Sequence, residues 1–409
     1  MKRVLFSIII ALIISGCMKE LRKEAFCEDS LSSVIEIEVK MPIGYDFNSE
    51  GISLIISDPV SGLQFSGTTD ANGRASIRVA HGTYNATAVV KHAEPGGIIY
   101  IFNGSANKIS VTPNDPNIAN VTIPLNASKT GQLIIKEAYY GGALNPITGK
   151  NYAYDKYVIL YNNSDEVAYL DSLGFAMAEP YNAPGAGRPS AWIKPGTSEL
   201  RDSIPAVSMA WIFPGSGYDN PLLPGEEIVI SMNGIDHTTI SPAAVNLGIA
   251  GYWAVYDPVM TSGQTVPNVG VKRLTCFWKV GTSNQFSFSQ TSPAFFIFSL
   301  GGKSTQQFVS DTYTWHPNQP ERRIFDCLLI DKELIIDGLE CFREATDSKR
   351  LRPEIDNGFA MTSGIGSGES VHRRVERVVE TSQGQRVVYM DTNNSTLDFE
   401  TRKRASLAK

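Results

Sequence analysis

Short apolar runs that alternate with polar residues recur along most of this chain, and turn residues separate them at intervals of roughly eight to twelve residues. In the first run Ile35, Ile37 and Val39 alternate with charged residues, which gives a strand one apolar and one solvated face. Asp70 and Gly73 then mark a turn, which we interpret as a hairpin, because Asp can bond its own backbone and Gly adopts positive φ. The pattern predicts an all-β protein built from antiparallel sandwiches.

The first residues have the layout of an export signal. Lys2 and Arg3 precede an apolar run over residues 4–14, which is shorter than the roughly twenty residues that a membrane-spanning helix needs. The run ends in Ile14-Ser15-Gly16-Cys17, which resembles the bacterial lipobox. Residues 1–16 are therefore predicted to be a signal peptide. Residues 17–33 are predicted to be the lipidated cysteine, Cys17, and a charged tether. The alternative is an ordinary signal peptide with a chance cysteine.

Composition argues against one class of partner and does not decide whether one pair of cysteines forms a disulfide. The net charge is −6, which argues against nucleic acid as a partner. An exported chain can form disulfides, and Cys327 and Cys341 could close one, but two buried free thiols are an equally good interpretation. A lipid anchor places the chain at the outer membrane, on either the periplasmic or the surface face.

Residues 34–127 carry a first family resemblance. The segment Thr69-Asp70 with Gly73-Arg74, followed by Gly82-Thr83-Tyr84 and Ala88, resembles the carboxypeptidase regulatory-like (prealbumin-like) domain. That resemblance implies a β-sandwich that serves as a spacer or adaptor and has no catalysis of its own.

Residues 131–400 carry a second resemblance, to the lamin-tail domain, which is an immunoglobulin-like sandwich. Its motifs occur here in the expected order, over residues 131–140, 156–164, 170–175 and 223–230, then 295–298 and 335–340 as later strands, and 370–374 with 391–399 as the closing segment. The two domains behind a lipobox together resemble a family of Gram-negative envelope lipoproteins whose function is not established.

The second region is larger than such a sandwich requires. An immunoglobulin-like domain needs roughly one hundred residues, and the excess lies in insertions at about residues 179–220 and 233–284. Long loops of this kind are usually functional or mobile. Trp192 and Trp211 in the first insertion either form a ligand-binding surface or pack beneath the loop. Residues 401–409 are predicted to be a tail.

Residues that carry catalytic or metal chemistry form no recognised motif in the sequence. HExxH, GxSxG and P-loop patterns are absent, so we expect a protein that is not an enzyme and needs no cofactor. Asp391, Asn393 and Asp398 give a weak calcium candidate. The alternative is that these residues form turns that bury Phe399, with Arg373 paired to Asp391 or Asp398.

Two functions are consistent with these features. The first is a non-catalytic envelope lipoprotein that binds or helps assemble an extracellular ligand or an outer-membrane partner. Such a partner would be a receptor or a glycan, and the role would be accessory to nutrient uptake. The alternative is a hydrolase that acts on an extracellular polymer, with its site in the insertion loops. A pocket with convergent carboxylates would favour the hydrolase.

Overall fold

The computed structural model describes residues 32–408, except for residues 44, 46–47, 94–98, 113–119, 130, 180–190, 261–264, 282–283, 317–325 and 383. The predicted signal peptide and Cys17 lie outside the described residues. The chain is 46% strand and 5% helix, which confirms the all-β prediction. Nowhere in the described part of the chain is there a helix long and apolar enough to cross a membrane.

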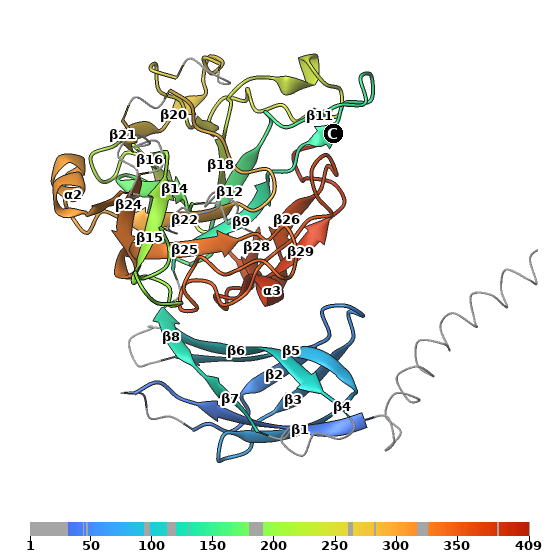
Figure 1. The fold of residues 1–409 in the computed structure, drawn as a ribbon. Coiled ribbons are helices and arrows are strands. Elements are labelled where there is room, and N and C mark those ends of the chain that lie inside the picture. Colours follow the sequence, from blue (N-terminus) through green and yellow to red (C-terminus); the bar gives the residue numbers. More distant parts are fainter. Residues whose placement is uncertain are drawn as a thin grey trace, which may run out of the picture. The chain divides into compact units, whose positions relative to one another are not determined.

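The chain divides into two compact units, residues 1–127 and 128–409. The first unit consists of two packed sheets (Figure 1). The smaller sheet has the order β4-β1-β7, with β1 (Ser32–Lys40), β4 (Arg74–Ala80) and β7 (Val121–Pro124). The larger sheet has the order β3-β2-β5-β6-β8, with β2 (Ser53–Ser57), β3 (Gln64–Thr68), β5 (Gly82–Ala93), β6 (Ile99–Val111) and β8 (Asn126–Lys129).

The alternating residues of the first unit fill the space between its sheets. Ile35, Ile37 and Val39 of β1 share one apolar cluster with Leu54 and Ile56 of β2. Fully burying a side chain of this kind contributes about 1.5–3 kcal/mol, so this core holds the two sheets together.

The turn at Asp70 differs from the predicted hairpin. The Asp70 carboxylate accepts hydrogen bonds from the backbone N–H of Asn72 and of Arg74, both at 2.9 Å, and Gly73 has φ 73°, as the sequence indicates. However, β3 pairs with β2 and β4 pairs with β1, so the turn connects strands of different sheets. The alternation of apolar residues fixes which face is buried but not which strand is the neighbour.

The second unit has three stacked sheets. The first has the order β20-β19-β18-β12-β9-β26-β29, with β9 (Leu133–Tyr139), β12 (Tyr157–Asn162), β18 (Glu227–Ser231), β19 (Trp253–Ala254), β20 (Lys272–Arg273), β26 (Ser370–Arg373) and β29 (Phe399–Arg402). The second has the order β21-β16-β14-β22-β25, with β14 (Leu173–Met177), β16 (Met209–Ile212), β21 (Thr275–Lys279), β22 (Ala294–Ser299) and β25 (Ile335–Glu340). The third has the order β15-β24-β23, with β15 (Ser203–Val207), β23 (Thr314–Trp315) and β24 (Cys327–Asp331).

Smaller elements complete this unit (Figure 1). They are the strand pairs β10 (Ala143–Leu144) with β11 (Asn151–Tyr152), β13 (Ala168–Tyr169) with β17 (Pro221–Leu222), and β27 (Val375–Thr381) with β28 (Gly384–Tyr389), and the short helices η1 (His237–Thr239), α2 (Thr305–Asp311), η3 (Lys332–Leu334) and α3 (Ser395–Asp398).

The five-stranded middle sheet is buried on both faces. Phe295 and Ile297 of β22 belong to the core shared with the seven-stranded sheet. Phe296 and Phe298 belong to a second core, together with residues of β15, β24 and α2. This arrangement explains why β22 is a continuous apolar run instead of an alternating one.

The predicted insertions contribute strands to the sheets of this unit. Residues 179–220 supply β15 and β16, and residues 233–284 supply β19, β20 and β21. Pro205 is accommodated because β15 is an edge strand, where a missing N–H donor costs little. The predicted tail is also ordered by packing: Ala405 is buried, and the backbone N–H of Ser406 donates to the Glu137 carboxylate at 2.9 Å.

Candidate functional site

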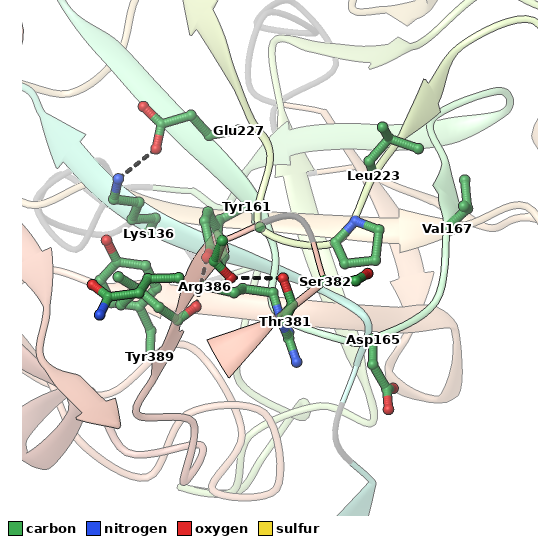
Figure 2. Close-up of a pocket in the computed structure, with 15 residues that line it drawn as sticks. Lys136, Tyr161, Asp165, Val167, Leu223, Glu227, Thr381, Ser382, Arg386 and Tyr389 are labelled. Carbon is green, nitrogen blue, oxygen red and sulfur yellow. Dashed lines mark hydrogen bonds and ion pairs between the residues drawn. The ribbon is translucent and has the colours of Figure 1, made fainter. Parts of the chain in front are cut away.

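A pocket of about 620 Å³ opens on the second unit where three segments meet beside β9 (Figure 2). The segments are the end of β12 with the loop after it, the Pro224–Gly225 turn before β18, and the β27–β28 hairpin. Gly225 has φ 83°, and a Cβ there would lie 3.0 Å from the Arg386 side chain. The turn thus needs glycine both for its backbone conformation and for its close approach to the hairpin.

Lys136 of β9 is one of the two cations that line the pocket. The pairing of β9 with β12 shifts register at this residue, and a bulge of this kind re-aims side chains and is frequent next to functional sites. The ammonium forms an ion pair with Glu227 and lies 5.6 Å from the Tyr161 ring centre and 5.3 Å from that of Tyr389. Burial alone would lower the pKa of Lys136, but the hydrogen bond and charge of Glu227 outweigh it, so the pKa is raised.

The hairpin wall is fixed to the body of the unit by side chains. The Arg386 guanidinium donates to the carbonyl of Asn163 at 3.2 Å. The Asn163 amide accepts from the Tyr389 N–H at 2.9 Å and donates to the Tyr389 carbonyl at 3.0 Å, which reproduces the bonding of a strand pair. Tyr161 donates its hydroxyl to the Val387 carbonyl at 2.5 Å. The pocket is consequently shaped before any ligand arrives.

Positive and negative groups balance in the pocket lining. Two cations, Lys136 and Arg386, face two carboxylates, Asp165 and Glu227. Figure 2 shows Glu227 and Asp165 at opposite ends of the pocket, so they do not converge on one point. Hydroxyl and amide groups of the hairpin add both donors and acceptors. The arrangement suits the binding of a polar ligand without net charge better than acid–base chemistry.

A buried ionic cluster ties together the strands that carry the pocket. Arg373 of β26 makes two bonds to Asp337 of β25, at 2.9 and 2.8 Å, and thereby links the seven-stranded sheet to the five-stranded one. The same guanidinium donates to the carbonyl of Ile135, beside Lys136, at 2.8 Å, and to the carbonyl of Met390, beside Tyr389, at 2.8 Å.

Two further carboxylates complete this cluster. Asp391 and Asp398 lie 3.1 and 3.2 Å from Arg373. Burial raises the pKa of Asp337 to about 7 and that of Asp398 to about 6, although Arg373 opposes both shifts. Burial alone would lower the pKa of Arg373, but the three carboxylates outweigh it and raise that pKa. One guanidinium faces three acids, so the cluster takes up a proton more readily than solvated aspartates do.

The same cluster accounts for the weak calcium candidate. The carboxylates of Asp391 and Asp398 contact the Arg373 guanidinium, which supplies the positive charge that a calcium ion would bring. Asn393 occupies a left-handed turn position with φ 51°. Phe399 is buried, with its ring centre 4.8 Å from the guanidinium carbon, as the turn interpretation expects. Over the described residues, no group of three or more His, Cys, Asp or Glu is placed to hold a metal ion.

The two tryptophans singled out in the sequence are both interior. Trp192 is 8% exposed, and Trp211 on β16 is fully buried, with its ring 5.6 Å from that of Phe286 in an edge-to-face contact. This placement fits the packing interpretation and gives neither indole a surface for a ligand. Tyr218 of the same segment is an exposed aromatic residue, at 77%, which sequence reasoning missed. Its position in a loop with Gly215 and Gly217 was the available signal.

The cysteines of the second unit are free thiols. Cys327 lies in β24, and Cys341 follows β25 in a different sheet; both are buried and neither forms a disulfide. Burial raises the pKa of the Cys276 thiol to about 12 and that of Cys341 still further, so neither supplies a thiolate near neutral pH.

Comparison with known proteins gives a fold relationship and no activity. Residues 223–406 match the model of a family described as "Protein of unknown function (DUF4876)". A crystal structure of a DUF4876 family protein from Bacteroides thetaiotaomicron VPI-5482 is 20% identical in sequence, with a TM-score of 0.55. The alignment covers 92% of this chain and 96% of that one. No curated protein matches the chain significantly.

Proposed function

We propose that this chain is a non-catalytic envelope lipoprotein that binds an extracellular ligand in the pocket lined by Lys136, Glu227 and Arg386. The lipid on Cys17 would hold it to the outer membrane, in a role accessory to nutrient uptake. The first unit would act as a carboxypeptidase regulatory-like spacer, and the second as a lamin-tail-like domain that presents the site.

One observation carries this proposal: the pocket is polar, charge-balanced and fixed in shape by its own hydrogen bonds. A preformed site avoids the entropic cost of ordering its walls on binding. The hydrolase alternative would need two carboxylates close together, whereas Asp165 and Glu227 lie at opposite ends (Figure 2).

The anchor has its own test. A Cys17→Ala variant should remain uncleaved or become soluble, because the acylated side chain is the proposed membrane attachment. Cell fractionation with high-salt washing, followed by immunoblotting, measures both outcomes. Retention of a processed Cys17→Ala protein in the washed membranes would contradict the anchor.

The pocket is tested by binding measurements on the full-length protein in detergent. The probes are a neutral glucan, a neutral mannan, polygalacturonate and a tryptic digest of casein, measured by affinity electrophoresis and calorimetry. We expect at least one probe to bind, and Lys136→Met or Glu227→Gln to weaken that binding about tenfold or more. Lys150→Met, which removes an exposed lysine outside the pocket, is the matched control and should bind as the wild type does. If no probe binds, or if the pocket variants bind normally, the proposed function is wrong.

A further inference from the structure

We infer that the ligand is an uncharged glycan chain that extends from the pocket onto an exposed aromatic ridge formed by Val167, Tyr169, Tyr218, Pro221 and Leu223. This inference rests on the proposed function and adds the ligand class and a second part of the site.

The ridge is the outer face of the β13–β17 strand pair. Ala168 and Leu222 are opposite each other and buried, so their neighbours point outward. Tyr169 faces Pro221 across the pair and is 41% exposed. Its ring meets that of Tyr218 edge-to-face, with ring centres 4.9 Å apart and an angle of 85° between the planes. An edge-to-face pair covers at most one face of either ring, so Tyr218, at 77% exposure, keeps an open ring face.

Tyr218 is held in place although its side chain is solvated. The Asp171 carboxylate accepts from the backbone N–H groups of Gly217 at 3.4 Å, Asp219 at 3.1 Å and Asn220 at 2.9 Å, so it bonds the loop on both sides of Tyr218. A Cβ at Gly215 would lie 1.6 Å from that carboxylate, which requires glycine there. A large exposed aromatic group on a loop fixed in this way loses little freedom on binding.

The ridge and the pocket form one continuous surface. Val167 and Leu223 are exposed, lie next to the paired residues of β13 and β17, and also line the pocket. Figure 2 shows them at the end of the pocket opposite Lys136 and Glu227. A ligand longer than the pocket would therefore pass over the tyrosines.

The chemistry of this surface fits a sugar chain. Pyranose rings present an apolar C–H face, which packs on an aromatic face, and a rim of hydroxyl groups, which need both donors and acceptors. The ridge supplies aromatic faces for the C–H face of a sugar, and the pocket supplies donors and acceptors for its hydroxyl groups. The five ridge side chains carry no charge, and the four charged groups of the pocket cancel, so these side chains supply no net charge that would favour an acidic polymer.

The test uses the same four probes with two ridge variants, Tyr218→Ala and Tyr169→Ala, and with Tyr313→Ala as matched control. Tyr313 is 66% exposed, precedes β23, and is neither a pocket-lining residue nor part of the β13–β17 pair. We expect only the neutral glucan or mannan to bind, with a loss of about tenfold or more for each ridge variant and none for Tyr313→Ala. An Asp171→Ala variant should also bind weakly, and Asp171→Asn should restore part of the affinity, because its amide oxygen still accepts from the loop.

The outcomes separate this inference from the proposed function. If polygalacturonate or the casein peptides bind and the pocket variants abolish that binding, the glycan inference is overturned and the binding function stands. If a neutral glycan binds through the pocket but the ridge variants bind normally, the ridge assignment is wrong. If the pocket variants weaken the binding of no probe, both the glycan inference and the proposed function are wrong.

Discussion

An Arg373→Met variant is expected to lose about 3–5 kcal/mol of unfolding free energy, measured by urea denaturation near neutral pH. Methionine keeps most of the apolar stem but leaves Asp337, Asp391 and Asp398 buried without a cation. In the wild type the Arg373 guanidinium donates to the carbonyls of Ile135 and Met390. The variant removes both hydrogen bonds and leaves these carbonyls without that donor. The loss should therefore exceed that from removing a surface charge several-fold.

The adjacent arginine provides the control. The Arg374 side chain is 47% exposed and lies 3.8 Å from Glu400 at the surface, so Arg374→Met should change stability by about 0.5 kcal/mol or less. A loss below about 1 kcal/mol for Arg373→Met would show that the cluster does not hold the two sheets together.

A Trp211→Ala variant is expected to lose about 3–5 kcal/mol, because a fully buried indole leaves a large cavity between the seven- and five-stranded sheets. Tyr218→Ala, in the same segment, should change stability by about 0.5 kcal/mol or less, since that side chain is solvated. Thermal and urea unfolding of both variants measure the contrast.

The ligand affinities of these two variants should follow the opposite order. Folded Trp211→Ala protein should bind nearly as well as the wild type, while Tyr218→Ala should lose affinity. Unchanged stability of Trp211→Ala, together with lost binding, would instead support the tryptophan as a ligand contact.

Strand positions were predictable from the sequence, but their partners were not. The alternation of Ile35, Ile37 and Val39 identifies β1 and its buried face. The turn at Asp70 has the local hydrogen bonds that its residues predict, yet it joins two sheets. Turn chemistry is decided within a few residues, whereas strand pairing depends on packing between distant segments.

The three-stranded sheet of the second unit could not be predicted from the sequence for a related reason. Residues 179–220 are rich in proline and glycine, which indicates loops, and Pro205 argues against a strand. The segment nonetheless forms β15 at a sheet edge, because its apolar residues pack on the apolar outer face of the middle sheet and remove that face from water. The continuous apolar run of Phe295 to Phe298 was the sequence signal for a sheet buried on both faces.

The candidate site could not be predicted because its residues are distant in sequence. Lys136, Tyr161, Glu227 and Arg386 meet only through the sheet order, and none belongs to a local motif. The calcium candidate is the opposite case, because its residues are close in sequence and do form a local pattern. The carboxylates of Asp391 and Asp398 nonetheless pair with Arg373, which comes from another strand.

Hydrogen–deuterium exchange of the full-length protein, with and without a saturating amount of the tightest-binding probe, tests the location of the site most directly. We predict that the ligand slows exchange of backbone amides in residues 223–227 and 384–389, the two segments that face each other across the pocket. Slowed exchange confined to residues 359–363 and 395–403, which line a second hollow of this unit, would place the ligand elsewhere and contradict the account.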